Sequence, residues 1–147
     1  MTVTIAGEPC AQGRPRATSI GGRIRMYDPK RSRSWKGAAR VQMVAALNGK
    51  GFIAEGPIDV RIRAYHSCPK SDYRKRTPTP QRWRSKRPDA DQIVKATLDA
   101  ATGVLWADDA QVARLLVEQF TAAQGDAPRV EVDVHVLPEF PIATGLM

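Results

Sequence analysis

Alternating apolar and polar residues predict four strands in this chain, at residues 2–6, 58–65, 112–120 and 129–136. In the second of these the apolar positions are Ile58, Val60, Ile62 and Ala64. A period of two places successive side chains on opposite faces of a strand. We therefore expect 58–65 to bury its apolar face and to expose a polar face that is mostly arginine.

Apolar residues spaced by three and four predict two helices. The first follows Asp28-Pro29, ends at the sequence Asn-Gly-Lys-Gly of 48–51, and has its apolar stripe at Trp35, Ala38, Ala39, Met43, Ala46 and Leu47. The second begins at Asp89, where Gln92 three positions later suggests a capping box, and runs to about Thr102 before Gly103. Its packing side is expected to consist of Ile93, Val94, Thr97, Leu98 and Ala101.

Glycine and proline mark the connections between these elements. Gly21-Gly22 suits a tight turn and predicts a hairpin over 14–27. Residues 69–88 have no periodicity, four prolines and eight lysines and arginines, so we expect a long mobile basic loop. The segment from Pro138 has no pattern and is expected to be a frayed tail.

The length of 147 residues suits a single domain, which we place at residues 1–137. No apolar run approaches the ~20 residues needed to cross a bilayer, and the first residues lack the pattern of a signal peptide, so we expect a cytoplasmic protein without a membrane partner. Zinc is not expected, because the cysteines and histidines of the chain are isolated from one another: Cys10, His66, Cys68 and His135.

Charge is divided unevenly along the chain. Residues 1–88 contain 20 lysines and arginines against 5 acids, whereas residues 89–147 contain 3 against 10. A basic protein of this kind favours a polyanionic partner, most commonly nucleic acid. The candidate phosphate contacts are Arg14, Arg16, Lys70, Arg74, Lys75, Arg76, Arg82, Arg84, Lys86 and Arg87. For the basic loop, the alternative is a solvated insertion that binds nothing.

Five aspartates lie within residues 89–109 of this basic chain: Asp89, Asp91, Asp99, Asp108 and Asp109. On the second helix Asp91, Lys95 and Asp99 are four residues apart and share a face. A structural interpretation makes Asp91 and Lys95 an ordinary ion pair, worth a few tenths of a kcal/mol. The functional interpretation is a Mg²⁺ site, completed when the chain returns Asp108 and Asp109 to the start of the helix.

A calcium-binding EF-hand loop is excluded at this segment. Position six of such a loop starting at Asp89 would be Val94 instead of glycine, and position twelve would be Ala100 instead of glutamate.

The sequence Pro-Asp-Ala-Asp-Gln-Ile-Val-Lys-Ala-Thr-Leu-Asp-Ala, followed by Gly-Val-Leu-Trp-Ala-Asp-Asp-Ala-Gln-Val, resembles the signature of the RusA family of Holliday junction resolvases. That signature combines Asp-x-Asp-Asn, a lysine four residues after the second aspartate, a further helical aspartate, a tryptophan and Asp-Asp-x-x-Val. The match covers residues 87–112, and the Arg-Pro-Arg of 14–16 and the Gly21-Gly22 turn resemble the family more loosely. Gln92 departs from the pattern, since the family has asparagine there.

The resemblance implies an α/β (α+β) fold with a mixed sheet and flanking helices, in a homodimer. It also implies that Asp89, Asp91 and Asp109 bind Mg²⁺ or Mn²⁺, that Lys95 is catalytic or contacts phosphate, and that Asp99 and Asp108 support them. Trp106 is expected to be a core residue behind Asp108 and Asp109 instead of stacking on a base.

The activity implied is a metal-dependent endonuclease that resolves four-way DNA junctions, in a bacterial cytoplasm and often encoded by a phage or prophage. Two alternatives stay open. One is a non-catalytic protein of the same fold that binds branched DNA, and the other is a less selective structure-specific or RNA-directed nuclease.

Overall fold

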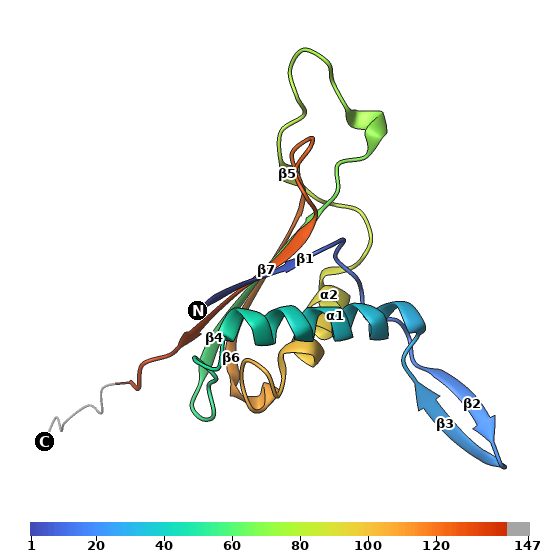
Figure 1. The fold of residues 1–147 in the computed structure, drawn as a ribbon, viewed down its shortest axis with the longest axis vertical. Helices are drawn as coiled ribbons and strands as arrows, with labels where there is room; N and C mark the ends of the chain where they lie inside the picture. The colour runs from blue at the N-terminus through green and yellow to red at the C-terminus, as the bar shows by residue number, and fades with distance from the viewer. Residues whose placement is uncertain (141–147) are drawn as a thin grey trace, which may run out of the picture.

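The computed structural model describes residues 1–140, and of the expected tail the residues 141–147 lie outside the described part. It shows an α+β domain with a mixed five-stranded sheet, two helices and a separate two-stranded ribbon (Figure 1). The sheet has the order β1-β7-β4-β6-β5, with β4 and β6 parallel and the other neighbours antiparallel. Its strands are β1 (Thr2–Ala6), β4 (Ile58–His66), β5 (Arg82–Trp83), β6 (Val112–Thr121) and β7 (Arg129–Val136).

Both long helices cover the same face of this sheet. Helix α1 (Lys30–Leu47) packs against β1, helix α2 (Ala90–Ala101) packs against β4 and β6, and the two helices contact each other. The buried strand residues all belong to one face of the sheet by register: Val3, Ile5, Ile58, Val60, Ile62, Ala64, Val130, Val132 and Val134. The apolar alternation predicted this face correctly. Within residues 1–140 neither helix is long and apolar enough to cross a membrane.

The opposite face of the sheet carries ion pairs and a row of aromatic rings. Arg63 Nη2 lies 2.6 Å from Asp133 Oδ2, and Tyr65 stacks on Phe120 with ring centroids 5.1 Å apart. On β4 the expected exposure of every second residue is wrong at Asp59, which is only 2% exposed. Its carboxylate is covered because Arg114 on the neighbouring strand β6 donates to Oδ2 at 2.9 Å.

The stripe predicted for α1 is correct at its centre and too wide at its edges. Ala39 and Met43 are buried and Trp35 and Leu47 pack partly against the core, but Ala38 and Ala46 are exposed. The helix contacts the domain along one narrow side, so these alanines lie beyond the contact. Helix α1 ends at Asn48, whose φ of 48° is left-handed, as the Asn-Gly sequence predicted.

The hairpin predicted over 14–27 is present as β2 (Arg16–Ile20) and β3 (Arg23–Tyr27). Gly21 and Gly22 form its turn with φ of +59° and +75°, values that side-chain-bearing residues rarely adopt. The ribbon projects from the body of the domain (Figure 1).

Residues 69–88 contain more regular structure than the prediction of a plain loop. A 3₁₀ turn, η1 (Lys70–Asp72), and the edge strand β5 both lie within them. The segment extends beyond the end of the sheet opposite to the start of β6 (Figure 1), and the Gln124 side chain accepts a hydrogen bond from Arg74 N at 2.8 Å. Backbone and side-chain hydrogen bonds of this kind have no apolar periodicity, so the sequence pattern does not reveal them.

Candidate active site

Helix α2 carries three of the predicted site residues on its exposed side. Ile93, Ala96, Thr97, Ala100 and Ala101 are buried against the sheet, and Asp91 and Lys95 are exposed on the other side. This amphipathic pattern fixes the direction in which Asp91 and Lys95 point.

The start of α2 differs from the capping box that the sequence predicts. Asp89 is the N-cap residue by backbone conformation, but its side chain makes no capping hydrogen bond. A capping box is found instead at Asp108, whose side chain accepts from Ala110 N at 2.8 Å while Gln111 bonds back to Asp108 N. Asp108 is therefore occupied in capping the 3₁₀ turn η2 (Asp109–Gln111), whereas the carboxylate of Asp89 is left free of this task.

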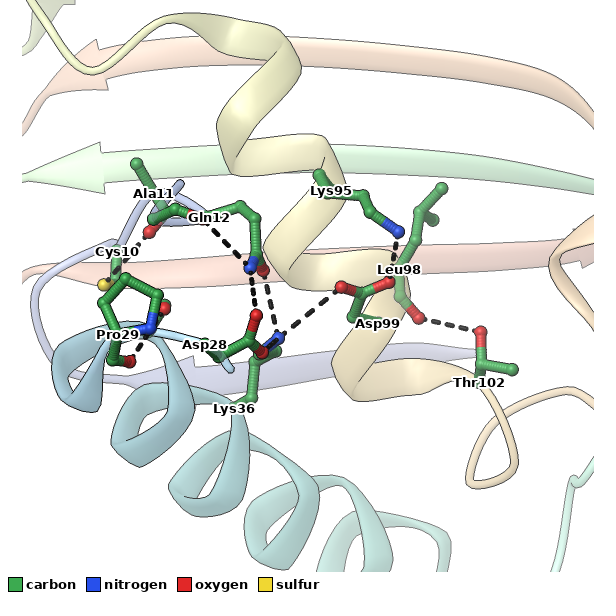
Figure 2. Close-up of polar contacts among 12 residues, drawn as sticks. Cys10, Ala11, Gln12, Asp28, Pro29, Lys36, Lys95, Leu98, Asp99 and Thr102 are labelled. Atoms are coloured by element: carbon green, nitrogen blue, oxygen red, sulfur yellow. Dashed lines mark hydrogen bonds and ion pairs between the residues drawn. The ribbon is translucent and has the colours of Figure 1, made fainter. Parts of the chain in front are cut away.

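Lys95 pairs with Asp99 and not with Asp91, which corrects the expected ion pair. Lys95 Nζ lies 2.8 Å from Asp99 Oδ1, and the other Asp99 oxygen lies 3.5 Å from Lys36 Nζ of α1 (Figure 2). The hydrogen bond to Asp99 holds the pKa of Lys95 above its ordinary value, with a further contribution from the charge of Asp109. Lys95 is accordingly a fixed positive charge beside two carboxylates.

Lys36 continues this chain of charges to Asp28 and Gln12, three residues that sequence reasoning did not assign to the site. It ion-pairs with Asp28 and donates to Gln12 Oε1 at 3.0 Å, and Gln12 in turn donates to Asp28 at 2.9 Å (Figure 2). The hydrogen bond from Lys36 holds the pKa of Asp28 below its ordinary value and outweighs the opposite effect of burial. The only available signal was a lysine on the inner side of a predicted helix.

Asp109 is held in place by its neighbours. Its Oδ1 accepts a hydrogen bond from the Thr102 hydroxyl and another from Trp106 Nε1 at 3.1 Å. Trp106 is 0% exposed, which confirms its expected place in the core behind the two aspartates. Asp109 lines a cleft of about 540 Å³ together with Asp99, Thr102 and four residues of α1, namely Arg33, Lys36, Gly37 and Arg40.

Asp89 opens onto a second and larger hollow, of about 910 Å³. Five arginines line this hollow: Arg14, Arg16, Arg31, Arg84 and Arg87. Glu8 and Asp89 are the acids at its wall, and burial lowers the pKa of His66, which adds no charge there at neutral pH. The hollow is therefore strongly cationic, with a carboxylate at the start of α2. Of its arginines, Arg31 was not among the residues predicted to contact phosphate.

The other predicted phosphate contacts lie in the segment 69–88. Arg74, Lys75, Arg76, Lys70 and Lys86 are exposed. Arg82 is ion-paired with Asp72, and Arg84 donates to the Arg87 carbonyl oxygen at 2.7 Å. The tip of the segment thus has free charges, and its base has charges engaged in holding the chain.

The predicted metal ligands fit a divalent cation by chemistry but are not assembled into one cluster. Asp89 and Asp91 have no hydrogen-bond or ion-pair partner for their side chains among the described residues, and carboxylate oxygens are the donors that Mg²⁺ prefers. In residues 1–140, however, no three His, Cys, Asp or Glu side chains are close enough together to hold a metal. Asp109 lies with Asp99 and Lys95, and Asp89 lies at the other end of α2.

Comparison with known proteins identifies the family. The chain is 34% identical over 137 residues to a Bacillus subtilis (strain 168) protein named "Uncharacterized protein YqaN", covering 90% of this chain and 93% of the relative. Residues 6–135 match the family model described as endodeoxyribonuclease RusA. That stretch includes the cationic hollow, the cleft and all of α2, so the chain belongs to the RusA family of endodeoxyribonucleases.

Proposed function

We propose that this protein is a metal-dependent endonuclease that cleaves four-way DNA junctions as a homodimer, in a bacterial cell. The observation that carries the proposal is the hollow lined by five arginines with Asp89 at its wall and the carboxylates of α2 beside it. Arginines neutralise a phosphate backbone, and carboxylates next to them supply what hydrolysis of that backbone requires. A hollow for a neutral small molecule would not need such a charge.

In this proposal Asp89, Asp91 and Asp109 hold Mg²⁺ or Mn²⁺. The cation supplies hydroxide at neutral pH by lowering the pKa of its bound water. Lys95, kept charged by Asp99, stabilises the negative charge that develops on the phosphate. Asp99 positions Lys95 and is not itself a ligand, because both of its oxygens face lysines.

A homodimer is proposed because a four-way junction has two-fold symmetry. Two identical sites related by a two-fold axis can cut two opposing strands of the junction. The alternatives differ in a measurable way: a non-catalytic protein binds junctions without cutting, and a less selective nuclease cuts duplex, single strands or RNA as well.

The test incubates the purified protein with labelled junction, linear duplex, single-stranded DNA and RNA, in Mg²⁺, Mn²⁺ or EDTA. Selective cutting of the junction that EDTA abolishes is the expected result. Junction binding without cutting in either metal would instead support the non-catalytic alternative.

Asp91→Asn is the matching variant, and its exposed position makes it harmless to the fold. It is expected to abolish cleavage while junction binding persists or improves, because a metal ligand is lost and a negative charge beside DNA is removed. Asp126→Asn, at an exposed turn elsewhere, is the control and should cut normally. Equal loss of binding and cleavage by a folded Asp91→Asn protein would contradict a role in metal binding.

A further inference from the structure

One edge of strand β6 has no neighbouring strand over most of its length. Strand β5 pairs only with Phe120 and Thr121, and the hydrogen bond from Arg84 N to the Gln119 carbonyl oxygen extends this contact by one residue. From Val112 to Glu118 no strand within residues 1–140 lies on that edge. An edge with unpaired N–H and C=O groups is a template for another strand.

The side chains along this edge are apolar in its middle. Leu115 and Leu116 are 42% and 46% exposed, on opposite faces of the sheet. By register, Leu115 and Val117 share the face covered by the helices, and Arg114, Leu116 and Glu118 share the other face. Glu118 has no ion-pair partner among the described residues.

We propose that β6 pairs antiparallel with β6 of a second copy of this chain, centred on Leu116; the inference rests on the homodimer of the proposed function. In this register Leu116 meets Leu116 of the second copy and Leu115 meets Val117. Arg114 meets Glu118 twice, once on each side of the centre. Directly opposed residues of antiparallel strands interact favourably when their charges are opposite.

Neighbouring registers lack this complementarity. With the centre at Leu115, Arg114 faces Leu116, and with the centre at Val117, Glu118 faces Leu116. A shift by one residue further moves side chains to the wrong face of the sheet. The charges therefore select the register centred on Leu116.

The pairing would form one ten-stranded sheet, with its two-fold axis perpendicular to the sheet at Leu116. Because α1 and α2 of each copy lie on a single face, both copies of α2 lie on the same side of the dimer. Val112 is four residues from the axis, or ~13 Å, so the two copies of it are ~26 Å apart. Two sites on one side at that separation suit two strands of one DNA junction.

A cysteine placed on the axis tests this arrangement directly. Directly opposed residues of antiparallel strands have Cα atoms about 4.5–5.5 Å apart, within the range that a disulfide bridges. We expect Leu116→Cys to form a covalent dimer under mild oxidation, seen on a non-reducing gel. Ala113→Cys, an exposed position on the same strand that would face Gln119, is the matched control and should stay monomeric on the gel, as should the native protein, whose Cys10 and Cys68 are buried.

The charges give a second and independent test by mass in solution. The native protein is expected at twice 16.2 kDa. Glu118→Arg places two arginines opposite each other and should raise the dimer dissociation constant at least tenfold, and addition of Arg114→Glu should restore the dimer. Because Arg114 also holds Asp59, thermal melting of each variant checks that it is folded.

The outcomes separate this inference from the proposed function. A native dimer without the Leu116→Cys crosslink overturns the β6 interface and leaves the homodimer intact. A native monomer overturns both the interface and the homodimer, and shows that Arg114 and Glu118 only protect the edge from aggregation. Neither measurement contains DNA or metal, so the cleavage assay decides nuclease activity separately.

Discussion

At the scale of single residues, Lys36 connects the parts of the candidate site. Its side chain is 14% exposed and contacts Gln12, Asp28 and Asp99, which come from three different segments. Asp99 in turn fixes Lys95. Removal of one partner from such a network leaves the others desolvated without compensation.

Lys36→Met is therefore expected to destabilise the protein. The loss should be about 1 kcal/mol, because the Asp28 side chain stays 32% exposed and water screens the charge that is left. For a domain of this size that corresponds to a fall in Tm of roughly 2–4 °C. Lys50→Met, at an exposed lysine beyond the same helix, is the control and should melt like the native protein.

A double-mutant cycle with Asp28→Asn separates the contact from a general effect of charge. The two substitutions should cost less together than the sum of their separate costs, since each removes the same ion pair. Strict additivity would show that Lys36 and Asp28 do not stabilise each other.

The partner of Lys95 illustrates what the sequence could not decide at this scale. Asp91 and Asp99 are both four residues from Lys95, so helical spacing makes them equivalent. The choice of Asp99 agrees with the position of Lys36, which is 63 residues away in the chain and lies on another helix. The same limit explains the missed Gln12 and Asp28.

At the scale of elements, the sequence predicted the main strands and both helices nearly to the residue. Their signals are local, because periods of two and 3.6 follow from which face each element buries. The failures concern long-range contacts. Asp59 is buried because Arg114 covers it from a parallel strand, and β5 exists because two residues pair with the end of β6.

The segment 69–88 gives a prediction at this scale. Arg74, Lys75 and Arg76 are exposed at its tip, in contrast to Arg82, which is engaged with Asp72. Neutralising the three tip residues together should weaken binding to junction and duplex alike. It should also lower the slope of log affinity against log salt by up to about 2.7, at roughly 0.9 per phosphate contact.

The choice of junction over duplex should survive this triple substitution, since phosphate contacts position DNA without reading its sequence. Lys50→Gln controls for the loss of overall charge, and the affinity is measured at several salt concentrations. Unchanged slopes would show that the segment is a solvated insertion that does not contact DNA.

At the scale of the whole molecule, the fold brings together charges that the sequence keeps apart. The arginines of the hollow come from residues 14–87, and Asp89 begins the acidic stretch, yet they share one wall. Composition predicted a basic partner surface and an acidic cluster, but only the three-dimensional structure shows that they adjoin. It also shows that the acids divide between the hollow and the cleft, which the spacing along α2 did not indicate.

The hydrogen bond from Trp106 to Asp109 makes the site visible to spectroscopy. The three tryptophans differ in environment: Trp83 is 70% exposed, Trp35 is partly buried, and Trp106 is fully buried with its indole N–H on the Asp109 carboxylate. In a protein carrying Trp35→Phe and Trp83→Phe, the remaining emission reports on Asp109 alone. Titration with Mg²⁺ should shift that fluorescence, because a cation on Asp109 changes the charge next to the indole, and Asp109→Asn should abolish the response. A flat titration by a preparation that cleaves DNA would exclude Asp109 as a ligand, so the chain contains its own optical sensor for the cation.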